Sequence, residues 1–223
     1  MKILIFINVM LLCISVPGIA LAITLRQGDL LFQDLDCGEL CNAITTVTSG
    51  YNNLEISHVG MVVSINNGLE VIEAHKNRVQ LTPLSNFLQR SVDIDKKPRV
   101  IVGRLISKYR YLIPEAVRHA LSWQGLPYNY NFSPHNDYRR FYCSQLIQDA
   151  FKLANHSKII FNNHKMTFKS NGRTLKDWHD YFKLIKSQIP EGQLGTNPGM
   201  MSRSQNINII FSYSDKMRKV NKN

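Results

Sequence analysis

The chain has 223 residues, of which 44% are hydrophobic and 19% are charged. This composition is typical of one globular domain with a sizeable core, and it excludes fibrous and largely disordered chains. The net charge of +11 would suggest a nucleic-acid partner in a cytoplasmic protein. However, the basic residues are scattered and lack interleaved aromatic residues, so we expect no nucleic-acid binding.

The first 22 residues differ from the rest of the chain. They contain Lys2, an apolar run, a helix-breaking Pro17-Gly18 pair and the small-x-small sequence of residues 20–22. This pattern predicts a secretory signal peptide that is cleaved before Ile23, and therefore a periplasmic or secreted protein with no remaining membrane span. The alternative is an uncleaved membrane anchor, for which the apolar stretch is short. Anionic lipid headgroups and cell-wall carboxylates are the partners available to a basic exported protein.

The elements in chain order predict one α+β domain over residues 23–214. Apolar and β-branched runs bounded by turn residues predict strands at 30–32, 56–65, 69–75, 78–84, 98–106 and 207–211. Helical spacing predicts helices at 37–50, 84–90, 114–125, 143–155 and 174–186. Because helices flank a consecutive run of strands, the sheet is expected to be mainly antiparallel. The polar and aromatic loop at 126–140 has a length that is often functional, and the basic residues 215–223 are predicted to form a flexible, solvated tail.

Three cysteines remain after the signal peptide is removed. Cys37 and Cys41 are four residues apart, a spacing that allows a disulfide bond only if the backbone brings the two Cβ atoms together. Two free, partly buried thiols are an equal alternative. No second cysteine pair or histidine pair accompanies them, so we predict no metal site. In either case Cys143 is left as the unpaired thiol.

Cys143 stands at the head of the predicted helix in FYCSQLIQDAF. A helix start lowers the pKa of a thiol, and its free backbone N–H groups can hold an oxyanion. These properties suit a nucleophile. A cysteine at a helix start is nevertheless more often a packing residue, so the assignment depends on finding a base.

His58 and Glu73 are the candidate base and its partner. Both residues occur in otherwise apolar strands, SHVGMVV and VIEAH, where a carboxylate is costly unless it is paired. A hairpin turn at residues 66–67 would place position 73 opposite about position 60, close to His58. Glu73 would then orient the imidazole. His75 is the rival for either role, and a buried core histidine is the alternative for His58.

Four segments together resemble a known family. GDLLF, SHVGMVV, VIEAH and YCSQLIQDAF are similar to segments of the NlpC-type, papain-like cysteine peptidases, but the cysteine helix comes last. This order resembles the circularly permuted branch, in particular the YiiX-like (YebB-like) hydrolases. The stretch IPEGQLGTNPGMMSRSQNI is similar to the proline-glycine tail segment of that branch, and the resemblance covers roughly residues 27–212.

The resemblance implies a site and an activity. It implies a permuted papain-like fold with Cys143 as nucleophile, His58 as general base and Glu73 as the orienting residue, without metal or organic cofactor. Tyr128 matches a tyrosine that lines the substrate cleft in these proteins, although packing of the loop is an equal alternative. The implied substrate is an amide in cell-wall stem peptides. Relatives similar to lecithin:retinol acyltransferase make a lipid acyl group the alternative, and a binding domain without chemistry is the third reading.

Overall fold

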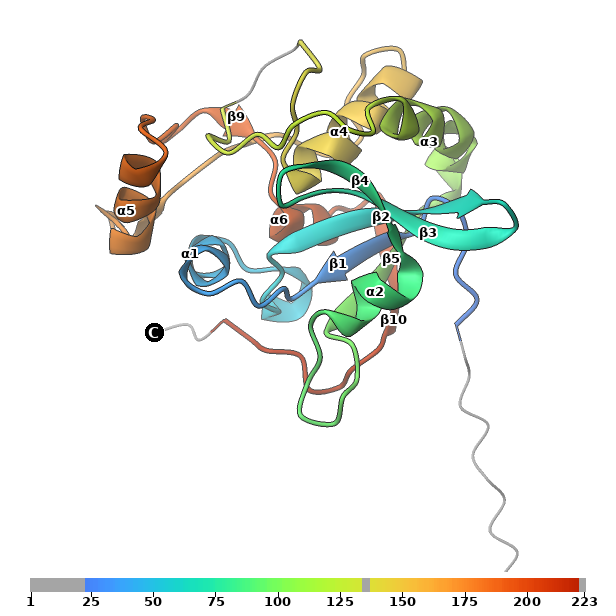
Figure 1. The fold of residues 1–223 in the computed structure, drawn as a ribbon, viewed down its shortest axis with the longest axis horizontal. Helices are drawn as coiled ribbons and strands as arrows, with labels where there is room; N and C mark the ends of the chain where they lie inside the picture. Colours follow the sequence, from blue (N-terminus) through green and yellow to red (C-terminus); the bar gives the residue numbers. More distant parts are fainter. Residues whose placement is uncertain (1–22, 134–136, 221–223) are drawn as a thin grey trace, which may run out of the picture.

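The computed structural model describes residues 23–133 and 137–220, so the predicted signal peptide at residues 1–22 lies outside the described residues. A six-stranded antiparallel sheet forms the centre of the molecule, in the order β10-β5-β1-β2-β3-β4 (Figure 1). Its strands are β1 (Leu30–Gln33), β2 (His58–Ile65), β3 (Gly68–His75), β4 (Arg78–Pro83), β5 (Val100–Leu105) and β10 (Ile207–Ser212). The predicted α+β class and the mainly antiparallel sheet are confirmed.

The two faces of the sheet are covered by different helices because successive strand side chains point to opposite sides. Phe32, Met61 and Ile72 belong to the larger core, which includes α3 (Ile113–Ser122) and α4 (Cys143–Ala154). Leu31, Val62 and Val71 face the other way and pack with Phe87 of α2 (Leu84–Gln89). Among the described residues, no helix has the length and apolar character needed to cross a membrane.

The β2–β3 hairpin turns at Asn66 and Asn67, whose φ angles of 48° and 64° are positive. Both central residues of a type I′ turn have positive φ, and asparagine tolerates this conformation. The ladder pairs Met61 with Ile72, so one further step along it brings Gly60 next to Glu73. The turn signal therefore predicts the register that later positions the site.

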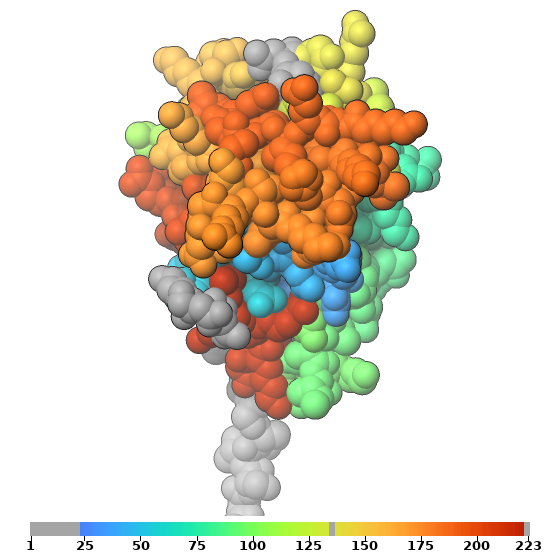
Figure 2. Space-filling model, turned by 90° about the vertical axis from the view of Figure 1, so that its left-hand side faces the viewer, coloured from blue at the N-terminus to red at the C-terminus, as the bar shows by residue number. Residues whose placement is uncertain are grey.

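A second structural region lies beside the sheet and consists of α1 (Glu39–Val47) and residues 164–197, here called the 164–197 segment. This segment contains β6 (His164–Lys165), β7 (Lys169–Ser170), β8 (Arg173–Thr174), α5 (Lys176–Leu184) and β9 (Leu194–Gly195), and it leads into α6 (Pro198–Ser202). In Figure 2 the segment, in orange, covers the face above α1, and α5 packs against α1. Two-residue strands carry no periodic signal, so the sequence predicts only α5 here.

The basic end of the chain differs from the expectation of a solvated tail. Residues 215–220 lie against the domain, where the Arg218 Nε donates to Asp34 at 2.8 Å and the Val220 N–H donates to the Asn53 carbonyl at 2.9 Å. Asp34 is buried, and a buried carboxylate needs a cationic partner. Long-range pairing of this kind leaves no local signal. Residues 221–223 lie outside the described residues.

Candidate active site

The site begins with two buried side chains on neighbouring strands. His58 is the first residue of β2, Glu73 lies on β3, and the His58 Nε2 and Glu73 Oε2 atoms are 2.6 Å apart. Only 4% of His58 and none of Glu73 is exposed. Gly60 lies between them along the ladder, where a Cβ atom would come within 2.4 Å of Val71 and 3.1 Å of Phe87. A larger residue here would therefore displace Val71 and crowd Phe87, whose ring lies 6.0 Å from the His58 ring.

Glu73 is held by three further hydrogen bonds from residues that sequence reasoning missed. The Thr82 hydroxyl donates to Glu73 Oε1 at 2.6 Å, and the Arg90 Nη1 and Nη2 groups donate to its two oxygens at 3.0 and 2.5 Å. The Arg90 Nε also donates to Gln33 at 2.8 Å. Burial alone would raise the pKa of Glu73, but the hydrogen bonds and charges of His58 and Arg90 hold it well below its usual range. Glu73 is therefore a fixed carboxylate.

Cys143 is the first residue of α4, and 6% of it is exposed. Its thiol lies within hydrogen-bonding reach of the His58 imidazole. Since Glu73 occupies Nε2, the Nδ1 atom is left to face the thiol. Burial lowers the pKa of His58, but the hydrogen bonds to Cys143 and Glu73 outweigh it and raise that pKa above its ordinary value of 6.5. The arrangement thus favours an imidazolium that is stabilised by the Glu73 carboxylate.

His75 also lies next to His58, but in a different relationship. The two rings meet edge-on with centroids 5.3 Å apart, and no hydrogen bond between them is formed. Burial and the neighbouring positive charge of His58 lower the pKa of His75 to about 4, so this ring is neutral near pH 7. Glu73, and not His75, is the hydrogen-bond partner of the His58 Nε2 atom.

One group of three side chains offers potential metal ligands in the described part of the chain. The candidate ligand atoms of His58, Glu73 and His75 all lie within 4.8 Å of one another. However, the Glu73 carboxylate already accepts hydrogen bonds from Arg90, whose guanidinium supplies the positive charge that a cation would bring. This donor set does not fit a resident metal ion unless the Arg90 pair is broken.

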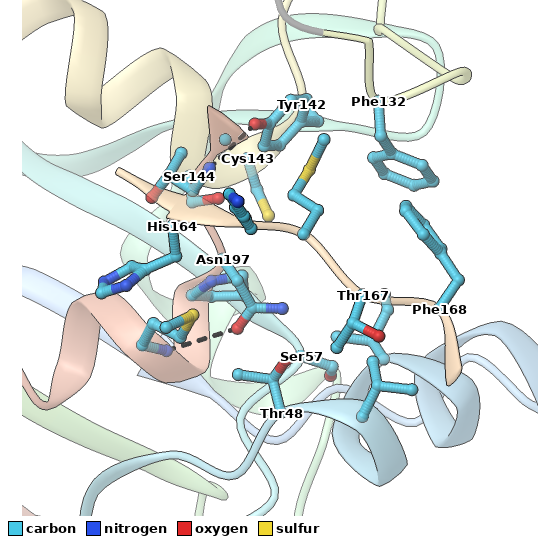
Figure 3. A pocket seen from close by; sticks show the side chains of 18 of the residues that line it. Thr48, Ser57, Phe132, Tyr142, Cys143, Ser144, His164, Thr167, Phe168 and Asn197 are labelled. Atoms are coloured by element: carbon cyan, nitrogen blue, oxygen red, sulfur yellow. Dashed lines mark hydrogen bonds between the residues drawn. The ribbon is translucent and has the colours of Figure 1, made fainter. Parts of the chain in front are cut away.

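A cavity of about 280 Å³ opens beside Cys143 (Figure 3). Its walls come from α1, from the start of α4, from the 164–197 segment and from α6, and they are mostly apolar. The apolar lining includes Ile44, Val47, Phe132, Met166, Phe168, Trp178, Pro198 and Met200. Lys165 and Arg203 add positive charge to the lining. Ser57, which precedes His58, and Cys143 itself both line this cavity.

Tyr128 lines the same cavity as Cys143. Its backbone forms an isolated parallel β-bridge with Phe141, and its ring packs against Tyr130 at a centroid distance of 5.1 Å. Burial and the neighbouring Cys143 charge raise the pKa of Tyr128 well above its usual range, so the phenol keeps its proton. The structure therefore brings together Tyr128, Cys143, His58 and Glu73.

Cys37 and Cys41 do not belong to this group of residues. They lie just before α1 and within it. Their Sγ atoms are at the bonding distance of 2.05 Å, and their Cα atoms are 5.3 Å apart. The bridge closes the first turn of the helix that carries Ile44 and Val47 into the cavity wall. Among the described residues, Cys143 is the free cysteine.

Comparison with known proteins finds a matching family and a similar solved structure. A family described as permuted papain-like amidase enzymes, YaeF/YiiX, C92 family, matches residues 24–211. The crystal structure of YiiX from Escherichia coli O157:H7, described as a metalloprotein, superposes with a TM-score of 0.67 at 21% sequence identity. The superposition covers 84% of this chain and 97% of YiiX. No curated protein matches the sequence.

Proposed function

Since the chain belongs to the permuted papain-like amidases, we propose that it is an exported cysteine amidase with Cys143 as nucleophile, His58 as general base and Glu73 as the residue that orients His58. The observation that carries this proposal is the buried row from Cys143 through His58 to Glu73, with 2.6 Å between the last two. A nucleophile, a base within reach and a third group that fixes the base are the recurring parts of covalent acyl transfer.

The reaction follows from these positions. His58 takes the Cys143 proton, and the thiolate attacks the carbonyl carbon to form a tetrahedral intermediate with a new C–S bond. The C–N bond then breaks, and the His58 imidazolium gives its proton to the leaving amine. Neutral His58 next takes a proton from water, and the water oxygen attacks the thioester carbonyl. The C–S bond breaks, a carboxylic acid leaves, and the His58 imidazolium returns its proton to the Cys143 thiolate. Glu73, held by Arg90, stabilises the imidazolium in both halves of the cycle.

The cavity favours a substrate with an apolar acyl group. Aliphatic and aromatic side chains form most of the wall next to Cys143, and a chain of several methylenes would bury its surface there. An N-acyl amide or lipid acyl ester therefore suits the cavity better than a polar peptide. A cell-wall stem peptide is the second candidate, because Lys165 and Arg203 offer partners for its carboxylates. A binding domain without chemistry leaves the Cys143–His58–Glu73 row unexplained.

Export remains part of the proposal. Residues 1–22 have the charge, apolar run and small-x-small ending of a signal peptide. Its cleavage would remove Cys13 and leave Cys37, Cys41 and Cys143 in an oxidising compartment, which suits the bond between the first two. N-terminal sequencing of the protein recovered from the periplasm or medium is expected to begin at Ile23, and a chain that begins at Met1 would contradict cleavage.

The description of YiiX as a metalloprotein does not carry over into this mechanism. Metal binding by His58, Glu73 and His75 would require the Glu73 carboxylate to leave Arg90 and the imidazole to leave Cys143. The proposed amidase therefore uses no step through a metal, and treatment with a chelator is expected to leave its activity unchanged.

The first experiment measures the rate at which iodoacetamide alkylates Cys143 across pH in the mature protein and in His58→Ala. The Cys143–His58–Glu73 row predicts rapid alkylation of Cys143 at pH values well below the ordinary thiol pKa of about 8.5. It also predicts that His58→Ala abolishes this rapid alkylation at low pH. Two equal profiles with an ordinary thiol pKa would reject the nucleophile.

A substrate panel then separates the candidate activities. Release of acid from N-acyl amides of increasing chain length is compared with release of stem peptides from purified cell wall. Cys143→Ala should abolish whichever activity is present. Binding of ligand by wild type and Cys143→Ala alike, with no hydrolysis of any member of the panel, would favour the binding domain instead.

A further inference from the structure

Asn197 lies in the wall of the cavity that contains Cys143 and has no role in the proposed row. It is half-buried and precedes Pro198 at the start of α6. Figure 3 shows its amide in the cavity, on the same side as the Cys143 side chain. A polar group in this mostly apolar cavity is a candidate for contact with the polar part of a substrate.

The orientation of the Asn197 amide is fixed by two hydrogen bonds. Its Oδ1 accepts from the backbone N–H of Gly199 at 2.7 Å and from that of Met200 at 3.3 Å. Both partners are donors, so the oxygen and not the nitrogen must face them. The Nδ2 group consequently points the other way, into the cavity, and no described residue accepts its hydrogens.

Close packing holds this turn in place. A Cβ atom at Gly199 would come within 3.0 Å of the Asn197 Oδ1, 3.1 Å of the Thr48 carbonyl and 3.2 Å of the Ser49 carbonyl. The start of α6 therefore packs tightly against the chain that follows α1. A donor held this firmly needs little reorganisation when charge develops on an acceptor, which is the property that an oxyanion hole requires.

A second unpaired donor lies beside the nucleophile. Ser144 is fully buried and lines the cavity, and its hydroxyl has no hydrogen-bond partner among the described residues. A buried polar group without a partner is uncommon in a folded protein. Ser144 and Asn197 approach the thiol region from different elements, α4 and α6, and within the described ranges both lack an acceptor.

We propose that the Asn197 Nδ2 group is the side-chain donor of the oxyanion hole for the Cys143 reaction, a role that rests on the proposed amidase function. When the Cys143 Sγ bonds to the carbonyl carbon, the π electron pair of the C=O bond moves to oxygen. The Nδ2–H donates to this oxyanion. When the intermediate collapses, the pair returns to form the carbonyl, the C–N bond breaks and the amine takes the proton of His58.

The test compares Asn197→Ser with wild type. Serine is a good N-cap, so it keeps the bonds to the start of α6 while removing the amide donor. For hydrolysis of N-octanoyl-p-nitroaniline, kcat is expected to fall about 10²-fold with KM within a few-fold, as for other side-chain oxyanion donors. Alkylation by iodoacetamide displaces iodide at a saturated carbon and forms no oxyanion, so its rate should not change. An equal fall in alkylation and hydrolysis would show a structural role and overturn the proposal.

A second test of the Asn197 role uses octanal, an aldehyde that binds the thiol reversibly, so it does not depend on turnover. Addition of the thiol to the aldehyde gives a tetrahedral hemithioacetal, and its formation is measured as protection of Cys143 from alkylation. Asn197→Ser should weaken this protection about 10²-fold. Equal protection in both proteins, or none in wild type, would overturn the Asn197 assignment. Protection of wild type without hydrolysis of any amide would instead reject only the proposed amidase function.

Tyr128→Phe tests the competing donor in the same cavity. It removes a hydroxyl from the wall of the same cavity and leaves the Asn197 amide in place. If Asn197 is the donor, the loss of octanal protection in Tyr128→Phe should be smaller than the loss in Asn197→Ser. If Tyr128→Phe shows the large loss and Asn197→Ser does not, the tyrosine is the oxyanion donor and the proposal fails.

Discussion

Two buried carboxylates in different regions of the molecule, Glu73 and Asp149, have opposite pKa shifts. In the sheet, Glu73 accepts hydrogen bonds from His58, Thr82 and Arg90, and these hold its pKa well below its usual range. Where α4 meets β9, Asp149 has no bonded cation among the described residues, and burial raises its pKa to about 6. The sheet region therefore maintains a fixed charge next to His58, the proposed general base.

The second region is the 164–197 segment, which contains β9 and is organised mainly by aromatic packing. Phe132, Phe168, Trp178 and Phe182 form an aromatic cluster around the 164–197 segment, and several of them line the cavity. Such packing is set by volume and contact area and tolerates changes that keep volume. The comparison suggests that the sheet supplies the chemistry of the proposed amidase and that the 164–197 segment selects the acyl group. Four sets of variants test this division.

Arg90→Met should have the largest effect. Removal of the guanidinium leaves the Glu73 carboxylate buried without its cation, which costs about 3 kcal/mol or more of unfolding free energy. Urea denaturation with unchanged m-value would measure this loss. Arg118→Met is the control, because its ion pair with Glu115 is exposed and the midpoint should stay within error. Equal stability of Arg90→Met and wild type would show that the network contributes nothing.

Glu73→Gln and His75→Phe separate the two neighbours of His58. The glutamine amide could still accept from His58 but lacks the charge that stabilises the imidazolium, so kcat/KM should fall about 10²-fold. The alkylation profile should also shift toward the ordinary thiol pKa. His75→Phe keeps the ring contact and should retain most of the activity. The opposite ranking would make His75 the orienting residue.

Asp149→Asn should stabilise the protein at neutral pH. The pKa of Asp149 is about 6 in the folded protein against an ordinary value of 3.8, so folding favours its protonated form. Wild-type stability should therefore fall as pH rises from about 4 to about 6, by about 3 kcal/mol from this group, and Asp149→Asn should remove that slope. Thermal melts at pH 4, 5, 6 and 7 measure it. Parallel curves for both proteins would contradict the raised pKa.

Met166→Ala should change selectivity with the smallest effect of the four. Met166 lines the cavity and packs against Gly195, so its loss removes apolar contact from an acyl chain. We expect kcat/KM to fall about tenfold for octanoyl amides and little for acetyl amides. The rate of alkylation should not change. Leu194→Ala, an exposed position outside this cavity, is the control. Equal losses for both chain lengths would contradict the assignment of the acyl group to this cavity.

The sequence by itself determined the parts that depend on local rules. Strand alternation and the Asn66–Gly68 turn set the β2–β3 register, and that register placed His58 beside Glu73. The helix that begins at Cys143 and the order of the elements were also predicted, because periodicity and turn residues act over a few neighbouring positions.

Only the tertiary structure decided the remaining features. Arg90 reaches Glu73 across 17 positions, Arg218 reaches Asp34 across 184, and the cavity combines residues 44–203. The Cys37–Cys41 bond and the direction of the Asn197 amide likewise depended on backbone geometry. Contacts between distant positions have no characteristic spacing in the sequence, since long-range packing and the neutralisation of buried charge select them only as the whole chain folds.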